Sequence, residues 1–327
     1  MANIKDIALK ANVSISTVSI IINGKSKERK ISQKTQDKVL QAMKELHYQP
    51  NLSAKKLRSP NMRKTIALFW TTDFRGIMLS CFLTGLQNKI KELSLNYDIV
   101  IYPYENDLLC EETVLESNSN FHGAIIANAS EKDLLFLKTL NPIVPIVLYN
   151  RDLAHYSSVS VSDLTIAKNA FELLKNEKRI AIVKAPYIFE GMKIRDDSLI
   201  QLLKDNNQTV LEYSVNSNDS INGLNIAKEI DFKNIDVIFT ASDMIALGLI
   251  RYCFLNNINI PKDFKILSIG NGLIHVDEFL SPSLSIIQIP LEQMAEECIT
   301  VLRKLFNGQD NIQKMVEPKI QLRESFY

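Results

Sequence analysis

Residues 13–25 read VSISTVSIIINGK, and this short stretch decides how the N-terminal part of the chain folds. It is too short, and too polar at its ends, to cross a membrane or to form a complete core helix. Upstream of it, apolar residues recur at helical spacing from Ile4 to Ala11, with Asn3 as a suitable N-cap. The quoted stretch therefore follows a first short helix.

The spacing around Asn12 is typical of a helix-turn-helix. Asn12 lies four residues after Ala8, and Val18 lies ten residues after Ala8. A small residue, a turn residue that tolerates the left-handed conformation and an apolar residue at this spacing let two helices cross closely. We therefore predict a second short helix, with Ser14 or Ser16 as its N-cap.

The helical period then sorts the isoleucines of this second helix. When Val18 points inward, Ile21 and Ile22 fall on the same side and pack in a small core. Ile20 points away from that core, and Ile15 lies on its border. Ile20 must therefore face either water or a partner.

A third helix is predicted after Ser32, and it would complete a three-helix head. The residues expected on its inner face are Val39, Leu40, Met43 and Leu46.

Charge separates this head from the rest of the chain. Residues 1–60 contain twelve lysines and arginines against four acidic residues, a net charge of +8, whereas the whole chain of 327 residues carries +1. The remainder is therefore acidic, at −7. A basic head on an acidic body indicates a polyanionic partner for the head alone, with a solvated basic surface as the alternative.

Composition argues against several other classes of protein. The chain is 46% hydrophobic and 23% charged, as in ordinary globular proteins, and no apolar run approaches the length of a membrane span. The N-terminus has no long apolar segment of the signal-peptide type, so we expect a cytoplasmic protein. The cysteines form no CxxC pair, and we expect buried, reduced thiols at Cys81, Cys110, Cys253 and Cys298.

No motif supports catalysis, a metal or a cofactor. The four histidines are scattered without ligand spacing, no GxGxxG follows the first strand of the body, and no GxSxG occurs. GKS at 24–26 has the letters of a phosphate-binding loop, but Ser19 replaces the required earlier glycine. GKSKERK (24–30) is better interpreted as a basic loop that contacts phosphates. We expect no enzymatic activity.

From residue 64 the chain alternates short apolar runs with amphipathic stretches. This pattern predicts parallel sheets with helices on both faces, arranged as two similar doubly wound lobes with a cleft at the strand ends. The expected strands are 65–70, 98–104, 123–128 and 145–150, then 179–185, 209–215, 236–242 and 265–271. The expected helices include 78–93, 131–140, 165–175, 193–205, 221–230 and 243–256.

Two segments of the head carry a family resemblance: NIKDIALKANVSISTVSIIINGK (3–25) and VLQAMKELHYQPNLSAKKLRS (39–59). They resemble the N-terminal signature of the LacI/GalR family of bacterial transcriptional regulators, and the rest of the chain resembles that family more weakly. The resemblance implies an all-α helix-turn-helix head, whose second helix lies in the major groove of operator DNA, and a periplasmic-binding-protein-like body of two α/β lobes.

The resemblance places Ile15, Ser16 and Ile20 at the positions that read bases. The family usually has polar residues there, often arginine or histidine at the position of Ile20. Isoleucine cannot form bidentate hydrogen bonds with a base, but its methyl groups can pack against the methyl group of thymine. We therefore expect thymines beneath Ile15 and Ile20 in each operator half-site.

The polar segment NLSAKKLRSPN (51–61) is too short to form a stable helix alone, and its composition also fits a flexible linker. The resemblance implies a hinge helix that orders on the operator, where the two hinges of a dimer enter the minor groove together. Leu57 would then wedge between base steps, and Ala54 would let the paired helices approach. The residues expected at the DNA are Ile15, Ser16, Thr17, Ser19, Ile20, Asn23, Lys25, Lys27, Tyr48, Asn51, Ala54, Leu57 and Arg58.

The resemblance also implies an effector in the cleft between the lobes. Met78 and Leu79 replace an aromatic pair of the family, and Gly272 stands where an aspartate is frequent. These changes remove features suited to sugar binding. A phosphorylated or otherwise anionic ligand that uses Arg151 and Arg195, or a cleft without an effector, therefore competes with a simple sugar. The candidate effector-binding residues are Asp73, Met78, Leu79, Arg151, Arg195, Ser242, Asp243 and Gly272.

The expected protein is a sequence-specific, homodimeric transcriptional repressor whose operator affinity depends on a small molecule, with coupling of either sign. The alternative is a solute-binding protein whose body carries the function, which the basic head and the missing export signal disfavour. The expected domains are a helix-turn-helix domain at 1–50, a hinge at 51–63, an N-terminal lobe at 64–160 and 289–318, and a C-terminal lobe at 161–288 and 319–327. The family's three crossings between lobes would fall near 160, 288 and 319.

Overall fold

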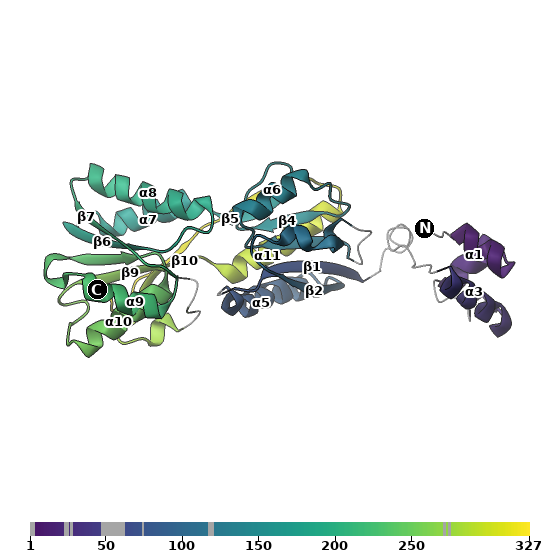
Figure 1. The fold of residues 1–327 in the computed structure, drawn as a ribbon, viewed down its shortest axis with the longest axis horizontal. Coiled ribbons are helices and arrows are strands. Elements are labelled where there is room, and N and C mark those ends of the chain that lie inside the picture. Colours follow the sequence, from purple (N-terminus) through teal and green to yellow (C-terminus); the bar gives the residue numbers. More distant parts are fainter. Residues whose placement is uncertain are drawn as a thin grey trace. The chain divides into compact units, whose positions relative to one another are not determined.

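The structure is a computed structural model that describes residues 4–22, 26, 29–46, 63–73, 75–116, 121–270, 273 and 276–327. The chain divides into two compact units, Met1–Met62 and Arg63–Tyr327, which we name the head and the body (Figure 1). The predicted fold class, a helical head followed by two parallel-sheet α/β lobes, is confirmed. Among the helices described, none combines the length and apolarity that a membrane crossing requires.

The head contains three helices, α1 (Ile4–Ala11), α2 (Ile15–Ile22) and α3 (Gln33–Glu45). Asn12 follows α1 in the left-handed conformation, with a φ of 52°, and the N–H of Val13 donates to the carbonyl of Ala8 at 3.0 Å. The hydroxyl of Ser14 accepts a hydrogen bond from the N–H of Thr17 at 3.0 Å and so caps α2. The predicted turn residue is confirmed, and the first of the two candidate serines is the cap.

A small apolar core holds the three helices together. The prediction for α3 is wrong at Leu40, which is 53% exposed. Ala42 is buried instead, because it follows Val39 by about one helical turn and so lies on the same face. The predicted cap Asn3 and the side chain of Ile22 lie outside the described residues. The buried core residues are Ile7, Ala8, Ala11, Val18, Ile21, Val39 and Ala42.

The first lobe is built on a six-stranded parallel sheet with the order β11-β5-β4-β3-β1-β2. Its strands are β1 (Lys64–Thr71), β2 (Tyr97–Tyr104), β3 (Gly123–Ala127), β4 (Ile146–Tyr149), β5 (Ser157–Val161) and β11 (Gln313–Val316). Its helices are α5 (Gly76–Glu92), α6 (Glu131–Thr139) and α11 (Leu291–Phe306), with short turns η1 (Leu109–Glu111) and η2 (Thr113–Leu115).

The second lobe repeats the design with the order β12-β10-β9-β8-β6-β7, in which only the edge strand β12 is antiparallel. Its strands are β6 (Arg179–Lys184), β7 (Thr209–Ser214), β8 (Val237–Thr240), β9 (Lys265–Gly270), β10 (Ser285–Gln288) and β12 (Lys319–Gln321). Its helices are α7 (Asp163–Leu174), α8 (Glu190–Asp205), α9 (Ser220–Ile226) and α10 (Asp243–Leu255), with η3 (Ala227–Glu229), η4 (Phe232–Asn234) and η5 (Asp277–Phe279).

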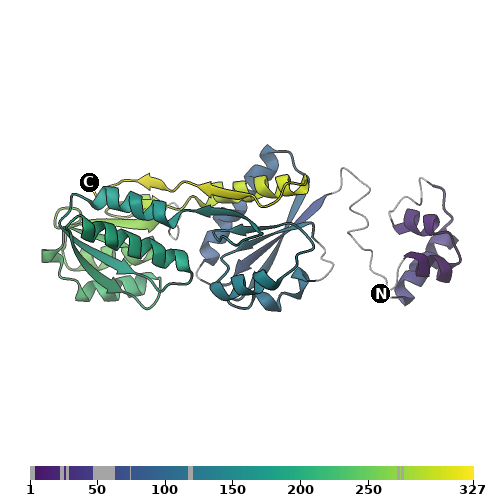
Figure 2. The ribbon, with the colours of Figure 1, turned by 90° about the horizontal axis from the view of Figure 1, so that it is seen from above.

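The chain passes between the two sheets between β5 and α7, between β10 and α11, and between β11 and β12. Figure 2 shows the C-terminal segments, in yellow, running along one side of both lobes. Each lobe is therefore assembled from segments that are distant in the sequence. The exact domain boundaries stay a prediction.

Two glycines let α9 and α10 pack closely in the second lobe. A Cβ atom on Gly248 would lie 2.1 Å from the carbonyl oxygen of Ser220, and one on Gly223 would lie 2.2 Å from that of Ile245. Real Cβ atoms do not approach other atoms this closely, so both positions require glycine.

Candidate functional site

The outward side of α2 carries the residues predicted to read DNA. Ser16 is exposed and Ile15 is 49% exposed, whereas Thr17, Ser19 and Ile20 are half-buried. Ile20 is not among the apolar side chains that pack against the core of the head. The fold therefore leaves the apolar side chain of Ile20 outside the core of a very small domain, on a helix that also presents the exposed Ser16.

The other predicted DNA contacts are only partly described. Lys10 forms an ion pair with Glu45 at 2.8 Å, which joins α1 to α3. The basic residues of the head whose side chains are described are exposed: Lys5, Lys10, Arg29, Lys30, Lys34 and Lys38. The predicted residues outside the described part of the chain are Asn23, Lys25, Lys27, Tyr48, Asn51, Ala54, Leu57 and Arg58. The basic loop and the hinge therefore stay predictions.

In the body, residues at the carboxyl ends of both sheets line a pocket of about 80 Å³ between the lobes. We name it the interlobe pocket. Open α/β sheets place ligands at this edge. Its lining includes Arg75, Met78, Asn128, Tyr149, Asn150 and Arg151 from the first lobe, and Phe189, Met192, Arg195, Asn218 and Ser242 from the second. Three arginines thus reach one small pocket.

Two of these arginines are neutralised by carboxylates. The Nε of Arg75 lies 2.9 Å from each carboxylate oxygen of Asp73, and its Nη1 donates to the carbonyl of Asn128 at 3.1 Å. Burial acts to raise the pKa of Asp73, but the hydrogen bonds and charge of Arg75 outweigh it and the pKa is lowered. Arg195 on α8 pairs with Asp163, at the start of α7, at 3.0 Å.

The first turn of α8 positions this second ion pair together with an aromatic ring. A Cβ atom on Gly191 would lie 2.1 Å from a carboxylate oxygen of Asp163 and 2.7 Å from the ring of Phe189. Glycine is therefore required for both groups to approach. Phe189 in turn covers Arg151, whose guanidinium carbon lies 3.7 Å from the ring centroid, within the range of a cation–π interaction.

Arg151 is the third arginine, and it forms no ion pair with any described residue. Its side chain is buried, and it donates to the carbonyls of Ala129 and Asn150, each at 2.5 Å. Burial, and then the charge of Arg75, lower the pKa of Arg151 to about 10, so it stays protonated at neutral pH. A buried cation that lacks a carboxylate can accept an anion with little rearrangement.

Asn128 adds a second donor at this pocket. The side chain is 7% exposed, and its amide nitrogen has no hydrogen-bond partner among the described residues. The residue adopts a φ of 64°, a conformation that asparagine tolerates. A buried N–H group without an acceptor is costly, so an oxygen atom of a ligand would stabilise it. Arg151 and Asn128 thus both offer hydrogen-bond donors that other protein groups leave unused.

The predicted effector-binding residues divide into two groups. Asp73 lies behind Arg75 rather than in the lining, and Leu79 packs against the core of the first lobe. Asp243 is fully buried and accepts a hydrogen bond from the N–H of Leu273 at 2.9 Å. Gly272 lies outside the described residues. The predicted residues that line the pocket are Met78, Arg151, Arg195 and Ser242.

The other lining residues were not predicted, and three of them matter most for ligand binding: Arg75, Asn128 and Phe189. Asn128 follows the buried strand β3 directly, and this position was a usable signal because strand ends border the cleft. Arg75 lies two residues after a predicted site residue, but nothing in the sequence shows that its side chain turns inward. Phe189 has no signal in the sequence, since its role depends on Arg151 of the other lobe.

The prediction of buried cysteines is only half right. Cys253 and Cys298 are buried, whereas Cys81 is half-buried and Cys110 is exposed. All four are free thiols, and burial is the main cause that raises the pKa of Cys253 to about 12. Within the described part of the chain, no three His, Cys, Asp or Glu residues form a group that could hold a metal ion.

Known proteins resemble both units. Residues 3–51 match the lacI family of bacterial regulatory proteins, and residues 178–326 match the periplasmic binding protein-like domain. The HTH-type transcriptional regulator pepR1 of Lactobacillus delbrueckii subsp. lactis is 27% identical over 94% of this chain and 91% of its own. A LacI family transcription regulator from Clostridium acetobutylicum is 32% identical, over 80% of this chain and 99% of the solved one, with a TM-score of 0.75. A lac repressor dimer bound to operator and the anti-inducer ONPF shares the fold at 19% identity, over 99% of both chains, with a TM-score of 0.69.

A helix-turn-helix head followed by a two-lobed body of the periplasmic-binding-protein type defines a DNA-binding transcriptional regulator. The chain belongs to the lacI family of bacterial regulatory proteins. The predicted family is therefore confirmed.

Proposed function

We propose that this regulator is a cytoplasmic repressor that binds a two-fold symmetric operator as a homodimer. An anionic small molecule in the interlobe pocket, of the sugar-phosphate or sugar-acid type, changes its affinity for the operator. One observation carries the ligand class: Arg151 is buried at the pocket without a carboxylate partner among the described residues.

The other donors at the pocket support the same ligand class. Asp73 and Asp163 already neutralise Arg75 and Arg195, so the positive charge that remains is that of Arg151. A phosphate or carboxylate can bind a guanidinium through two parallel hydrogen bonds, which a neutral hydroxyl group cannot. The amide nitrogen of Asn128 offers one more donor to the same anion.

The size of the pocket links ligand binding to lobe movement. Its volume of about 80 Å³ is well below the roughly 300–1,000 Å³ that is usual for small-molecule sites. The lobes must therefore separate to admit a sugar-sized ligand, and the three crossings between the sheets provide the hinge. A ligand that prefers one lobe angle shifts the population of that angle and so alters the state of the head.

On the DNA side, α2 would enter the major groove with Ile15, Ser16 and Ile20 toward the bases. The half-exposed isoleucines support contact with thymine methyl groups. Exposed lysines such as Lys34 and Lys38 would contact phosphates, which adds affinity and salt dependence without sequence selectivity. The hinge would add minor-groove contacts through Leu57.

Replacing Arg151 with methionine should weaken binding of the anionic effector at least about tenfold, because one charge-assisted contact contributes about 1.5–3 kcal/mol. The probes are matched pairs, glucose with glucose 6-phosphate and glucose with gluconate, followed by further phosphorylated sugars. Thermal shift identifies the ligand, and titration calorimetry measures its affinity. Gel shift with an operator obtained by binding-site selection then shows whether the ligand releases or strengthens DNA binding.

Lys132→Met is the matched control, because it removes the same charge from an exposed position of α6. It should bind the anion like the unmodified protein. A neutral sugar that binds equally well to the unmodified protein and to Arg151→Met would refute the anionic class. Absence of binding by every probe would favour a cleft without an effector.

An exposed apolar surface on the second lobe supports the dimer. Phe254 is 69% exposed and Tyr327 is 77% exposed, and both line one groove of about 480 Å³ together with Ile258. Leu255 on the same helix is 55% exposed. Monomeric proteins rarely leave such contiguous apolar surface in water. A two-fold axis through this surface would bury it against the same surface of a second protomer.

Replacing Phe254 with serine should therefore shift the protein from dimer toward monomer at micromolar concentration, since an aromatic anchor of the interface is lost. Sedimentation velocity measures the change. Leu135→Ser, at a 59% exposed position of α6 in the first lobe, is the control and should remain dimeric. An unmodified protein that sediments as a monomer would contradict the dimer itself.

A further inference from the structure

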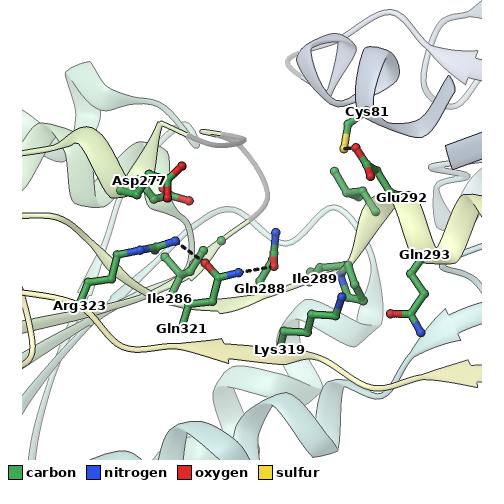
Figure 3. Close-up of a pocket in the computed structure, with 14 residues that line it drawn as sticks. Cys81, Asp277, Ile286, Gln288, Ile289, Glu292, Gln293, Lys319, Gln321 and Arg323 are labelled. Atoms are coloured by element: carbon green, nitrogen blue, oxygen red, sulfur yellow. Dashed lines mark hydrogen bonds between the residues drawn. The ribbon is translucent and has the colours of Figure 1, made fainter. Parts of the chain in front are cut away.

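A second and larger pocket lies where the chain crosses between the lobes (Figure 3). Its volume is about 310 Å³, at the lower end of the usual range for small-molecule sites. We name it the crossover pocket. Cys81 and Glu292 line it from the first lobe, and Gln288, Lys319 and Arg323 line it from the second.

The crossover pocket is distinct from the interlobe pocket but adjoins it. Only Ile289 and Leu291 line both; Ile289 directly follows β10, and Leu291 is the first residue of α11. None of the three arginines of the interlobe pocket reaches the crossover pocket. A ligand in the crossover pocket would therefore contact both lobes directly at their hinge.

One side of the crossover pocket is rich in hydrogen-bond donors. Arg323 donates to the side-chain oxygen of Gln321. The amide nitrogen of Gln321 in turn donates to the side-chain oxygen of Gln288 at 2.7 Å. Figure 3 shows these three side chains as a hydrogen-bonded row, with Lys319 beyond it. The row uses the oxygen of Gln288 and leaves its amide nitrogen without an acceptor among the described residues. Lys319 is exposed and forms no ion pair with any residue that the structure describes.

Three carboxylates also line the pocket: Asp277 and Glu278 from the second lobe and Glu292 at the start of α11. The carboxylate of Glu292 accepts a hydrogen bond from the Cys81 thiol at 3.6 Å, a long contact to a weak donor. Burial and then the charge of Glu292 raise the pKa of Cys81 to about 11, so the thiol stays protonated. The thiol therefore does not neutralise Glu292. The buried apolar side chains of Ile286 and Ile289 line the pocket as well.

We propose that the crossover pocket binds a free α-amino acid. The ligand's carboxylate would accept hydrogen bonds from Lys319 and the amide nitrogen of Gln288. Its ammonium group would pair with Glu292, and an aliphatic side chain would pack against Ile286 and Ile289. Lys319 and Glu292 both lack an ion-pair partner among the described residues. A zwitterion, whose ammonium and carboxylate share one carbon, could pair with both of them, whereas a ligand with a single charge could pair with only one.

The proposal goes beyond the anionic effector, and it does not depend on that effector. A bound amino acid would fix the distance between Glu292 on the first lobe and Lys319 on the second. It would therefore favour one lobe angle, and it would influence the interlobe pocket through Ile289 and Leu291.

The test uses the full-length protein and the twenty standard L-amino acids, one at a time, in titration calorimetry. The amino acid that binds is then compared with its N-acetyl derivative, which lacks the cation, and its amide, which lacks the anion. We expect both derivatives to bind at least about tenfold more weakly, as expected for loss of one charge-assisted contact. Lys319→Met and Glu292→Gln should each weaken binding of the amino acid by a similar factor.

Arg151→Met separates this proposal from the proposed function, because Arg151 does not line the crossover pocket and the amino acid should still bind to this variant. Lys314→Met, an exposed lysine on β11 outside the pocket, controls for loss of charge. Circular dichroism establishes that Lys319→Met and Glu292→Gln are folded. Failure of all twenty amino acids to bind, or equal binding of the N-acetyl derivative, would overturn the proposal.

Discussion

Replacing Val18 with aspartate should unfold the head and abolish operator binding while the body melts at its normal temperature. Val18 is completely buried in a core of only a few side chains. An unpaired carboxylate in such a core costs several kcal/mol, which a domain of about sixty residues cannot absorb. The body forms a separate compact unit, so its unfolding should not change. Gel shift, calorimetric melting and limited proteolysis of the full-length protein measure these effects.

Ile20→Asp is the matched variant, because it introduces the same charge two residues further along α2. Ile20 is half-buried but does not pack against the core of the head, so the head should stay folded and resist proteolysis. Operator affinity should still fall at least about a hundredfold, since the new carboxylate meets the DNA phosphates and the thymine contact is lost. If Ile20→Asp binds the operator normally, α2 does not read the bases through this side chain.

Replacing Gly248 with alanine should destabilise the second lobe by about 3 kcal/mol or more. The new Cβ would lie 2.1 Å from the carbonyl oxygen of Ser220 and 2.5 Å from the backbone nitrogen of Leu224. These are backbone atoms of α9, so the two helices must move apart, and the apolar core on which they pack loses contacts. For a body of this size, such a loss lowers the melting temperature by roughly 6–12 °C.

Gly76→Ala is the control for this substitution. Gly76 is the first residue of α5, and no atom lies within 4 Å of the Cβ position. The change should be within about 1 kcal/mol, because alanine is the better helix former and nothing obstructs it. Differential scanning calorimetry of both variants compares the two positions. Equal melting temperatures for Gly248→Ala and the unmodified protein would show that α9 and α10 adjust without cost.

Most strands of the body could be predicted because they are continuous apolar runs. All eight expected strands are present within one or two residues, for example 265–271 against β9. The strand β5 was missed because its sequence, SSVSV, lacks that signal. Its serines are buried through hydrogen bonds, such as those from Ser158 and Ser160 to Asp152, which only the folded chain creates. The short strands β11 and β12 are exposed for much of their length and gave no apolar pattern.

The candidate sites show the same division between local and tertiary information. The turn at Asn12 and the inward position of Val18 follow from spacing within one short segment, and both were predictable. The state of the arginines was not. Arg75 and Arg195 have carboxylate partners whereas Arg151 has none among the described residues, and these differences arise from contacts between elements far apart in the chain.

The threefold passage between the lobes also determines the order in which the protein can be completed during translation. The first sheet includes β11, and α11 packs on α5 so closely that a Cβ on Gly85 would lie 2.3 Å from the carbonyl oxygen of Glu292. The first lobe therefore cannot finish folding until the last few dozen residues have left the ribosome. The second lobe lacks only β12 once β10 has emerged. The nascent chain should accordingly fold its second lobe first. The apolar side of α5 in the first lobe should stay uncovered, as a substrate for chaperones, until synthesis is nearly finished.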